Sequence, residues 1–226
     1  MIDFSGRHFG KHIILMAVRW YFAYALSYRD IEELLRERGI VVDHATINRW
    51  VIEFGPQLAT SFKKRKAAVN DSWRMDETYI KIKGVWYYQY RAVDKYGATI
   101  DCLLCKRRDE TAAVRFFKKA IRSSGMPAKV TIDKSGSNTA ALNTINKPLK
   151  KEKQIEVRQI KYLNNLVEQD HRFIKKIIKP MKGFKSFNSA RATLFGIKLH
   201  HMLRKRQYLG KETCTTVWDQ FYELAA

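Results

Sequence analysis

The sequence predicts an α/β protein in which a mixed β-sheet follows a helical segment. Three observations support this. Apolar residues recur at helical spacing up to residue 54, three strand-like runs rich in Tyr, Val and Ile follow, and strand-like and helix-like segments then alternate. A meander that changes to strand–helix alternation implies a mixed sheet, because right-handed crossovers make the later strands parallel.

Three helices are predicted in the first part of the chain. The first covers 11–25, where apolar residues repeat at four-residue spacing. The second begins after Ser27, which is a good N-cap, and ends at Gly39. The third begins after Asp43, and the pair at 55–56, Gly followed by Pro, is expected to end it. Two short helices joined by a tight turn have the outline of a helix-turn-helix.

The second helix of such a motif enters the DNA major groove, where its early polar residues meet base edges. Here those residues are His44, Thr46, Asn48 and Arg49. Asn pairs with adenine and Arg with guanine through two hydrogen bonds each. The alternative is a plain helical hairpin that packs on a larger domain, and the pattern alone does not decide between them.

Five strands and their connecting helices are predicted after residue 72. The strands are 73–84, 85–97, 98–108, 129–133 and 155–160, and the helices lie at 109–125, within 138–150, at 165–178, after Phe187 and at the C-terminus. This order of elements is the RNase H-like layout. The predicted organisation is therefore a helical DNA-binding region at 1–55, a basic linker at 56–72, a catalytic domain at 73–185 and a C-terminal helical segment at 186–226.

Three carboxylates from distant parts of the chain are expected to meet in this layout. Asp76 lies in the first strand, Asp133 ends the fourth strand, and Glu168 opens the long helix. The first and fourth strands are predicted neighbours, and the helix would pack across their ends. Crowded carboxylates repel one another unless a cation lies between them. Hard divalent ions, above all Mg²⁺ with phosphate substrates, meet that need and support in-line displacement at phosphorus.

The spacing alone is a weak motif, and each residue has an ordinary structural alternative. Asp133 and Glu168 are separated by 34 residues. A pair of acids at this spacing could occur by chance in a chain with this many acidic residues. Asp133 could cap a turn, and Glu168 could favour its helix N-terminus. That alternative is poor for Asp76, because Asp is depleted in strands and is seldom buried alone.

Positive charge points to a polyanionic partner. The 226 residues carry 43 Lys and Arg against 22 Asp and Glu, a formal net charge of +21. A compact core gains nothing from such an imbalance, which marks nucleic-acid binding. His171, Arg172 and Lys175 follow Glu168 at spacings of 3, 4 and 7, so we expect them to share its helix face and to hold DNA phosphate.

Other classes of protein are disfavoured. Three cysteines do not make a disulfide framework, and the Cys102-x-x-Cys105 pair lacks the second pair of a zinc site, so ordinary packing is expected there. The apolar run at 13–26 contains Arg19 and is too short to span a bilayer. We therefore expect a cytoplasmic protein that associates with DNA and not with a membrane.

Several stretches together resemble the DDE transposases of bacterial insertion sequences, in particular the insertion sequence six family. They include SYRDIEELLRERGIVVDHATINRW, WRMDETYIKI, YRAVDKYG, TIDKSG, RQIKYLNNLVEQDH and GFKSFNSA. The similarity spans nearly the whole chain, and the part after Lys211 is the least familiar.

The resemblance implies an RNase H-like domain that uses Mg²⁺, for which Mn²⁺ could substitute. The family's acids fall on Asp76 in MDETY, Asp133 in TIDKS and Glu168 in NNLVEQDH, and its following basic residue falls on Lys175. It also implies binding of double-stranded DNA at the element's terminal inverted repeats, joining to target DNA by replicative transposition, and action as a homo-oligomer.

Two other functions stay open on the residues alone. The first is a DNA-binding regulator with an inactive nuclease-like domain, although such a protein has no need of an acid at Asp76. The second is a Mg²⁺ nuclease that cuts DNA without joining it, which only the family resemblance disfavours.

Overall fold

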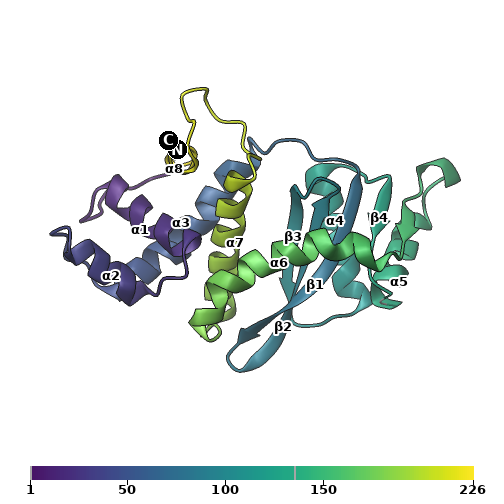
Figure 1. Ribbon diagram of the computed structural model, residues 1–226, viewed down its shortest axis with the longest axis horizontal. Helices are drawn as coiled ribbons and strands as arrows, with labels where there is room; N and C mark the ends of the chain where they lie inside the picture. The colour runs from purple at the N-terminus through teal and green to yellow at the C-terminus, as the bar shows by residue number, and fades with distance from the viewer. Residues whose placement is uncertain (1, 135) are drawn as a thin grey trace. The chain divides into compact units, whose positions relative to one another are not determined.

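A computed structural model of the chain describes residues 2–134 and 136–226, which form two compact units (Figure 1). The helical unit comprises the described residues up to Ala67 together with Ile174–Ala226. The sheet unit comprises Ala68–Phe173. The C-terminal helices therefore belong to the same unit as the N-terminal helices.

The helical unit contains α1 (Lys11–Ala23), α2 (Tyr28–Arg36), α3 (His44–Lys63), α7 (Phe187–Arg204) and α8 (Val217–Glu223). The predicted caps of α2 and α3 are confirmed. Ser27 and Asp30 form a reciprocal capping box, and the side chain of Asp43 accepts from the backbone N–H groups of Ala45 and Thr46. Seven residues separate α2 from α3, so the connection is longer than a tight turn.

Gly39 ends α2 as predicted, because its positive φ of 73° suits a residue without a Cβ. The N–H of Ile40 donates to the carbonyl of Leu35, and the N–H of Gly39 donates to the carbonyl of Arg36. These two bonds satisfy carbonyls that the end of the helix would otherwise leave unpaired.

The expected break at Gly55 and Pro56 is wrong, because α3 continues without interruption to Lys63. A proline inside a helix removes one hydrogen bond and costs about 3 kcal/mol. Beyond it, however, the helix buries Leu58 and Phe62, each worth roughly 1.5–3 kcal/mol. Tertiary packing therefore outweighs the local signal, and the first part of the predicted linker is helical.

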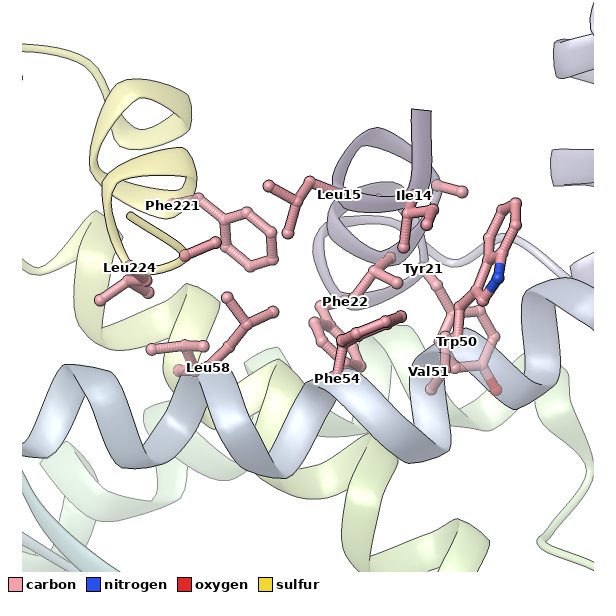
Figure 2. Packing of buried hydrophobic residues seen from close by; sticks show 14 of the residues in the cluster. Ile14, Leu15, Tyr21, Phe22, Trp50, Val51, Phe54, Leu58, Phe221 and Leu224 are labelled. Carbon is pink, nitrogen blue, oxygen red and sulfur yellow. The ribbon is translucent and has the colours of Figure 1, made fainter. Parts of the chain in front are cut away.

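Phe22 lies at the centre of the helical unit's core (Figure 2). An added Cβ would lie 2.1 Å from the Phe22 ring at Gly196 of α7 and 3.0 Å from it at Gly55 of α3. The two glycines thus let α3 and α7 approach the ring. Phe221 and Leu224, at the C-terminal end of the chain, pack toward Leu15 in the same core (Figure 2).

The sheet unit holds five strands in the order β3-β2-β1-β4-β5. The strands are β1 (Ser72–Ile82), β2 (Val85–Asp94), β3 (Thr99–Cys105), β4 (Lys129–Thr131) and β5 (Glu156–Arg158). The first three pair antiparallel, whereas β4 pairs parallel with β1 and β5 parallel with β4. This is the predicted RNase H-like mixed sheet, with β1 at its centre and β1 beside β4.

The two faces of the sheet differ in polarity. Helices α4 (Glu110–Ser124) and α5 (Gly136–Asn146) cover the apolar face, where Trp73, Tyr90 and Phe116 are buried together. The other face is polar, and the first turns of α6 (Asn165–Ile178) lie over it, where Asp170 pairs with the buried Arg91. The chain also contains short 3-10 turns at Lys151–Lys153, Lys161–Asn164 and Lys179–Met181.

Cys102 and Cys105 are buried free thiols in β3, as the expected ordinary packing requires. Within the described part of the chain, no helix combines the length and the apolar character that crossing a membrane requires.

Candidate active site

The candidate site lies where β1 continues past the end of β4. Pairing between these parallel strands covers only Ser72–Arg74 on β1, and β4 ends at Thr131. Asp76 is two residues beyond the last paired residue of β1, and Asp133 is two residues beyond the end of β4. Parallel strands with this register bring the two acids to the same edge.

Three carboxylates converge there. One oxygen each of Asp76, Glu77 and Asp133 lies within 4.8 Å of the others, and within residues 2–134 and 136–226 this is the group found with metal-ligand geometry. The structure thus brings two predicted residues together and adds Glu77. Strand alternation points Glu77 to the face opposite Asp76, which is why sequence reasoning passed over it, although it follows Asp76 directly in MDETY.

Burial and like charge both act on this group. Desolvation raises the pKa of Asp76 above its ordinary value, the neighbouring charges of Asp133 and Glu168 raise it further, and the backbone N–H of Glu77 and the charge of Arg108 oppose the change. Burial likewise raises the pKa of Glu77, with Arg108 as the main opposing influence. The site therefore favours an added positive charge.

Arg108 already supplies one positive charge. Its Nη2 lies 3.0 Å from Oδ2 of Asp133 and 3.2 Å from Oε2 of Glu77. On the other side of Asp133, Nδ2 of the buried Asn138 donates to Oδ1 at 3.3 Å. These bonds fix the Asp133 carboxylate between α5 and the segment that follows β3.

Two residues of α6 attach its first turns to the polar face of the sheet. Asp170 accepts from Arg91 in a fully buried ion pair, and Nη2 of Arg91 also donates to Oγ1 of Thr99 at 3.2 Å. One residue further on, Nδ1 of the buried His171 lies 3.6 Å from Oδ2 of Asp76. These contacts hold the first turns of the helix against β1 and β2.

Glu168 lies in the first turn of α6, as predicted, and is exposed. It lies outside the group of carboxylates within 4.8 Å of one another, yet its charge contributes to the raised pKa of Asp76. The structure therefore brings Asp76 and Asp133 together and leaves Glu168 nearby but more distant.

His171 does not lie where the sequence predicted. It is 5% exposed and faces Asp76 instead of sharing an open surface with Glu168. His171 lies four residues after Val167 and three before Ile174, which are both buried, so it belongs to the buried stripe of the helix. Arg172 and Lys175 are exposed, as DNA contacts require, and Lys175 belongs to the helical unit.

The four residues predicted to meet bases lie in the first two turns of α3. His44 and Arg49 are exposed, while Thr46 and Asn48 are half-buried. Nδ1 of His44 lies 3.0 Å from Oε2 of Glu32, and Nη2 of Arg49 donates to Oγ1 of Thr46 at 2.6 Å. Base contacts by His44 and Arg49 would therefore replace existing hydrogen bonds.

The carboxylates at the site fit a hard divalent cation. The group offers only oxygen donors, which Mg²⁺ and similar ions prefer. Asp76 and Glu77 are desolvated and lie close to Asp133, so a bound cation would relieve both the repulsion and the burial of charge.

Comparison with known proteins gives three findings. The family model of the DDE domain of IS240-type transposases matches residues 70–207. The chain is 44% identical over 203 residues, 90% of this chain and 89% of the relative, to the transposase for insertion sequence-like element IS431mec of Staphylococcus aureus (strain Mu50). The same identity and coverage hold for the S. aureus transposase of element IS257 in transposon Tn4003.

Solved structures also resemble this chain. The HTLV-2 integrase catalytic core domain in complex with magnesium matches with a TM-score of 0.46 at 16% identity, over 69% of this chain and 99% of that chain.

Proposed function

We propose that Asp76, Asp133 and Glu168 are the catalytic carboxylates of this chain, which belongs to the insertion sequence six family of DDE transposases. The protein is accordingly a DNA transposase, a polynucleotidyl transferase of the DDE class. The observation that carries the assignment is the convergence of Asp76, within β1, and Asp133, two residues past the end of β4. The raised pKa of Asp76, to which Glu168 contributes, supports the third member.

Asp76 and Asp133 would hold a divalent ion, Mg²⁺ by preference with Mn²⁺ as a substitute, and Glu168 would complete the binding of metal. When bound, such an ion stabilises negative charge on the attacking and leaving oxygens of an in-line displacement at phosphorus. These acids must be ionised to bind the metal ion. Burial of Asp76 opposes its ionised form, and the positive charge of a bound ion would offset that cost.

The reaction has two displacements at phosphorus. A water molecule attacks a phosphodiester at the element end, the bond from phosphorus to the 3′-oxygen breaks, and a 3′-hydroxyl and a 5′-phosphate result. That hydroxyl then attacks a target phosphodiester, forming one new phosphorus–oxygen bond as another breaks. Arg172 and Lys175, both exposed on α6, would neutralise phosphate charge beside the reacting bond.

The net positive charge and the helices of the helical unit favour DNA as the partner. The first turns of α3, with His44, Thr46, Asn48 and Arg49, would bind the terminal inverted repeats of the element. Between residues 145 and 211, 18 Lys and Arg stand against 4 Asp and Glu, which suits a surface that follows the DNA backbone. A homo-oligomer of this chain would pair the two ends of the element and join them to target DNA by replicative transposition.

A strand-transfer assay tests the proposed transposase activity. It contains purified full-length protein, Mg²⁺, a labelled element-end duplex and a target plasmid. We expect joined product from the wild type and none from Asp133→Asn, because the substitution removes the charge and keeps the shape. Asp71→Asn is the matched control, since Asp71 is exposed. If wild type and variant bind the duplex and neither cuts it, the protein is a regulator. If the wild type cuts without joining, it is a nuclease.

A further inference from the structure

The β1–β2 hairpin extends beyond the rest of the sheet and carries exposed aromatic rings. Neither β4 nor β3 pairs with its end: β4 covers β1 only to Arg74, and the pairing of β3 with β2 begins at Tyr88. Figure 1 shows the two strands continuing past their neighbours as a ribbon. Tyr79 is 53% exposed and Trp86 56% exposed.

These rings lie on one face and contact one another. Tyr79 pairs directly with Tyr88 across the strands, and their ring centroids are 5.3 Å apart. The Tyr79 and Trp86 rings meet edge to face at 6.1 Å. We call Tyr79, Trp86 and Tyr88 the aromatic strip. Clustered exposed rings of this kind mark a binding surface far more often than scattered ones do.

The aromatic strip adjoins the candidate active site through Glu77, whose carboxylate lies within 4.8 Å of those of Asp76 and Asp133 although its strand position faces away from Asp76. Side chains two apart on a strand share a face, so Glu77, Tyr79 and Lys81 follow one another along β1. One strand residue advances about 3.3 Å, which places Tyr79 about 7 Å along β1 from Glu77. One or two nucleotides of a DNA strand would span this distance from a phosphodiester that reacts at the candidate active site.

Positive charge borders the aromatic strip. Lys81 Nζ lies 5.6 Å from the centre of the Trp86 ring, and Lys83 is exposed at the hairpin turn. Lys106 and Arg107, both exposed, follow β3 directly after Cys105, the residue that pairs with Tyr88. Residues 79–88 contain no acid.

An exposed aromatic surface could bind a second copy of this chain or a nucleic acid, and the surrounding charge distinguishes between them. A second copy packed strip to strip would bring the bordering lysines of both copies, Lys81 and Lys83, into one interface, and like charges repel. A nucleic acid brings phosphates to the lysines and base rings to the aromatic side chains. That combination is the usual design of surfaces that bind unpaired nucleotides.

We propose that the aromatic strip binds unpaired bases of the DNA strand next to the reacting phosphodiester, by stacking on Tyr79 and Trp86. This inference rests on the proposed function, since it concerns DNA held at the same site. Bases inside a duplex already stack on their neighbours, so they must leave the helix to reach a side-chain ring. The aromatic strip would therefore favour DNA whose end is frayed or mispaired over fully paired DNA.

Fluorescence anisotropy with the full-length protein in EDTA tests the preference without catalysis. The probes are an element-end duplex with unpaired terminal bases, the same duplex fully paired, and an oligothymidine. We expect Tyr79→Ala with Trp86→Ala to weaken binding of the unpaired and single-stranded probes about tenfold, and of the paired duplex less than about twofold. Trp86→Phe should restore most of the loss, and Trp86→Leu should not.

Tyr96→Ala is the matched control. Tyr96 is 77% exposed on the same unit, and Lys95 Nζ lies 4.9 Å from its ring centre, so a general effect of exposed aromatics would appear there too. Equal losses on all probes, or no loss on any, would overturn the proposal. Unchanged DNA binding with a smaller oligomer in sedimentation would instead assign the strip to a second copy.

The two proposals fail separately. If Asp133→Asn retains the preference for unpaired DNA and the wild type never joins DNA, the stacking site stands and the proposed function falls. If joining proceeds and no probe preference exists, the stacking site falls alone.

Discussion

The replacement Arg91→Met is expected to destabilise the sheet unit strongly, because it leaves the Asp170 carboxylate buried without its arginine. Arg91 is fully buried, and the Asp170 side chain is 4% exposed. Removing one partner of a buried ion pair costs about 3–5 kcal/mol, since the remaining charge is then desolvated without compensation. For a unit of about 100 residues, each kcal/mol lowers the melting temperature by roughly 4–8 °C.

Urea unfolding followed by far-ultraviolet circular dichroism measures this loss. The double variant Arg91→Met with Asp170→Leu should regain most of the stability, because apolar residues of similar volume replace buried ion pairs at little cost. Lys129→Met is the control, since its pair with Glu156 is about half exposed at 3.2 Å and such pairs contribute at most about 1 kcal/mol. A loss below about 1 kcal/mol for Arg91→Met would refute the claim that this pair anchors α6.

Three further predictions concern packing, pH and metal. Gly196→Ala should cost at least about 1–3 kcal/mol in urea unfolding, because its Cβ would lie 2.1 Å from the Phe22 ring. Gly136→Ala is the comparison, because Gly136 is exposed and a Cβ there would meet no atom within 4 Å. Asp76→Asn should stabilise the metal-free protein in EDTA at neutral pH. Because folding raises the pKa of Asp76, the folded state prefers the proton, so the wild type loses stability as pH rises from the ordinary Asp value through the raised pKa. Melting curves against pH should show the advantage vanish below the ordinary value. Arg108→Gln should tighten Mn²⁺ binding about fivefold in calorimetry. The substitution removes the guanidinium that lies 3.0 Å from Asp133 and competes with the metal ion, and a partly exposed ion pair of this kind is worth about 1 kcal/mol. Unchanged affinity would show that Arg108 does not compete with metal.

Local patterns in the sequence predicted most of the fold. Cap residues such as Ser27, Asp43 and Asp109 act through hydrogen bonds to neighbouring N–H groups, so a short window contains the whole interaction. The long helix at Asn165–Ile178 matches its predicted bounds, and Pro180 lies two residues beyond its last residue, where proline disfavours a continuing helix. The strand order followed from the meander and the crossovers, and it placed Asp76 beside Asp133.

What the sequence could not predict depends on contacts between distant residues. The continuation of α3 past Pro56 depends on the burial of Leu58 and Phe62 in a core that includes Tyr208, which lies far away in the chain. The burial of His171 depends on how closely α6 packs on the sheet. Glu77 joins the site because Arg108 draws its carboxylate toward Asp133, and no local pattern around Glu77 indicates that arginine.

Glu168 and Glu77 are the two candidates for the third catalytic acid. The structure gathers Glu77 with Asp76 and Asp133, whereas we assign the catalytic role to Glu168 and give Glu77 the role of holding Arg108. Single-turnover cleavage of an element-end duplex by Glu168→Gln and by Glu77→Gln, measured side by side, separates the two. We predict a loss of about a thousandfold for Glu168→Gln, as expected when several kcal/mol of charge stabilisation is removed, and less than about tenfold for Glu77→Gln. A larger loss for Glu77→Gln than for Glu168→Gln would contradict this assignment and make Glu77 the third catalytic carboxylate.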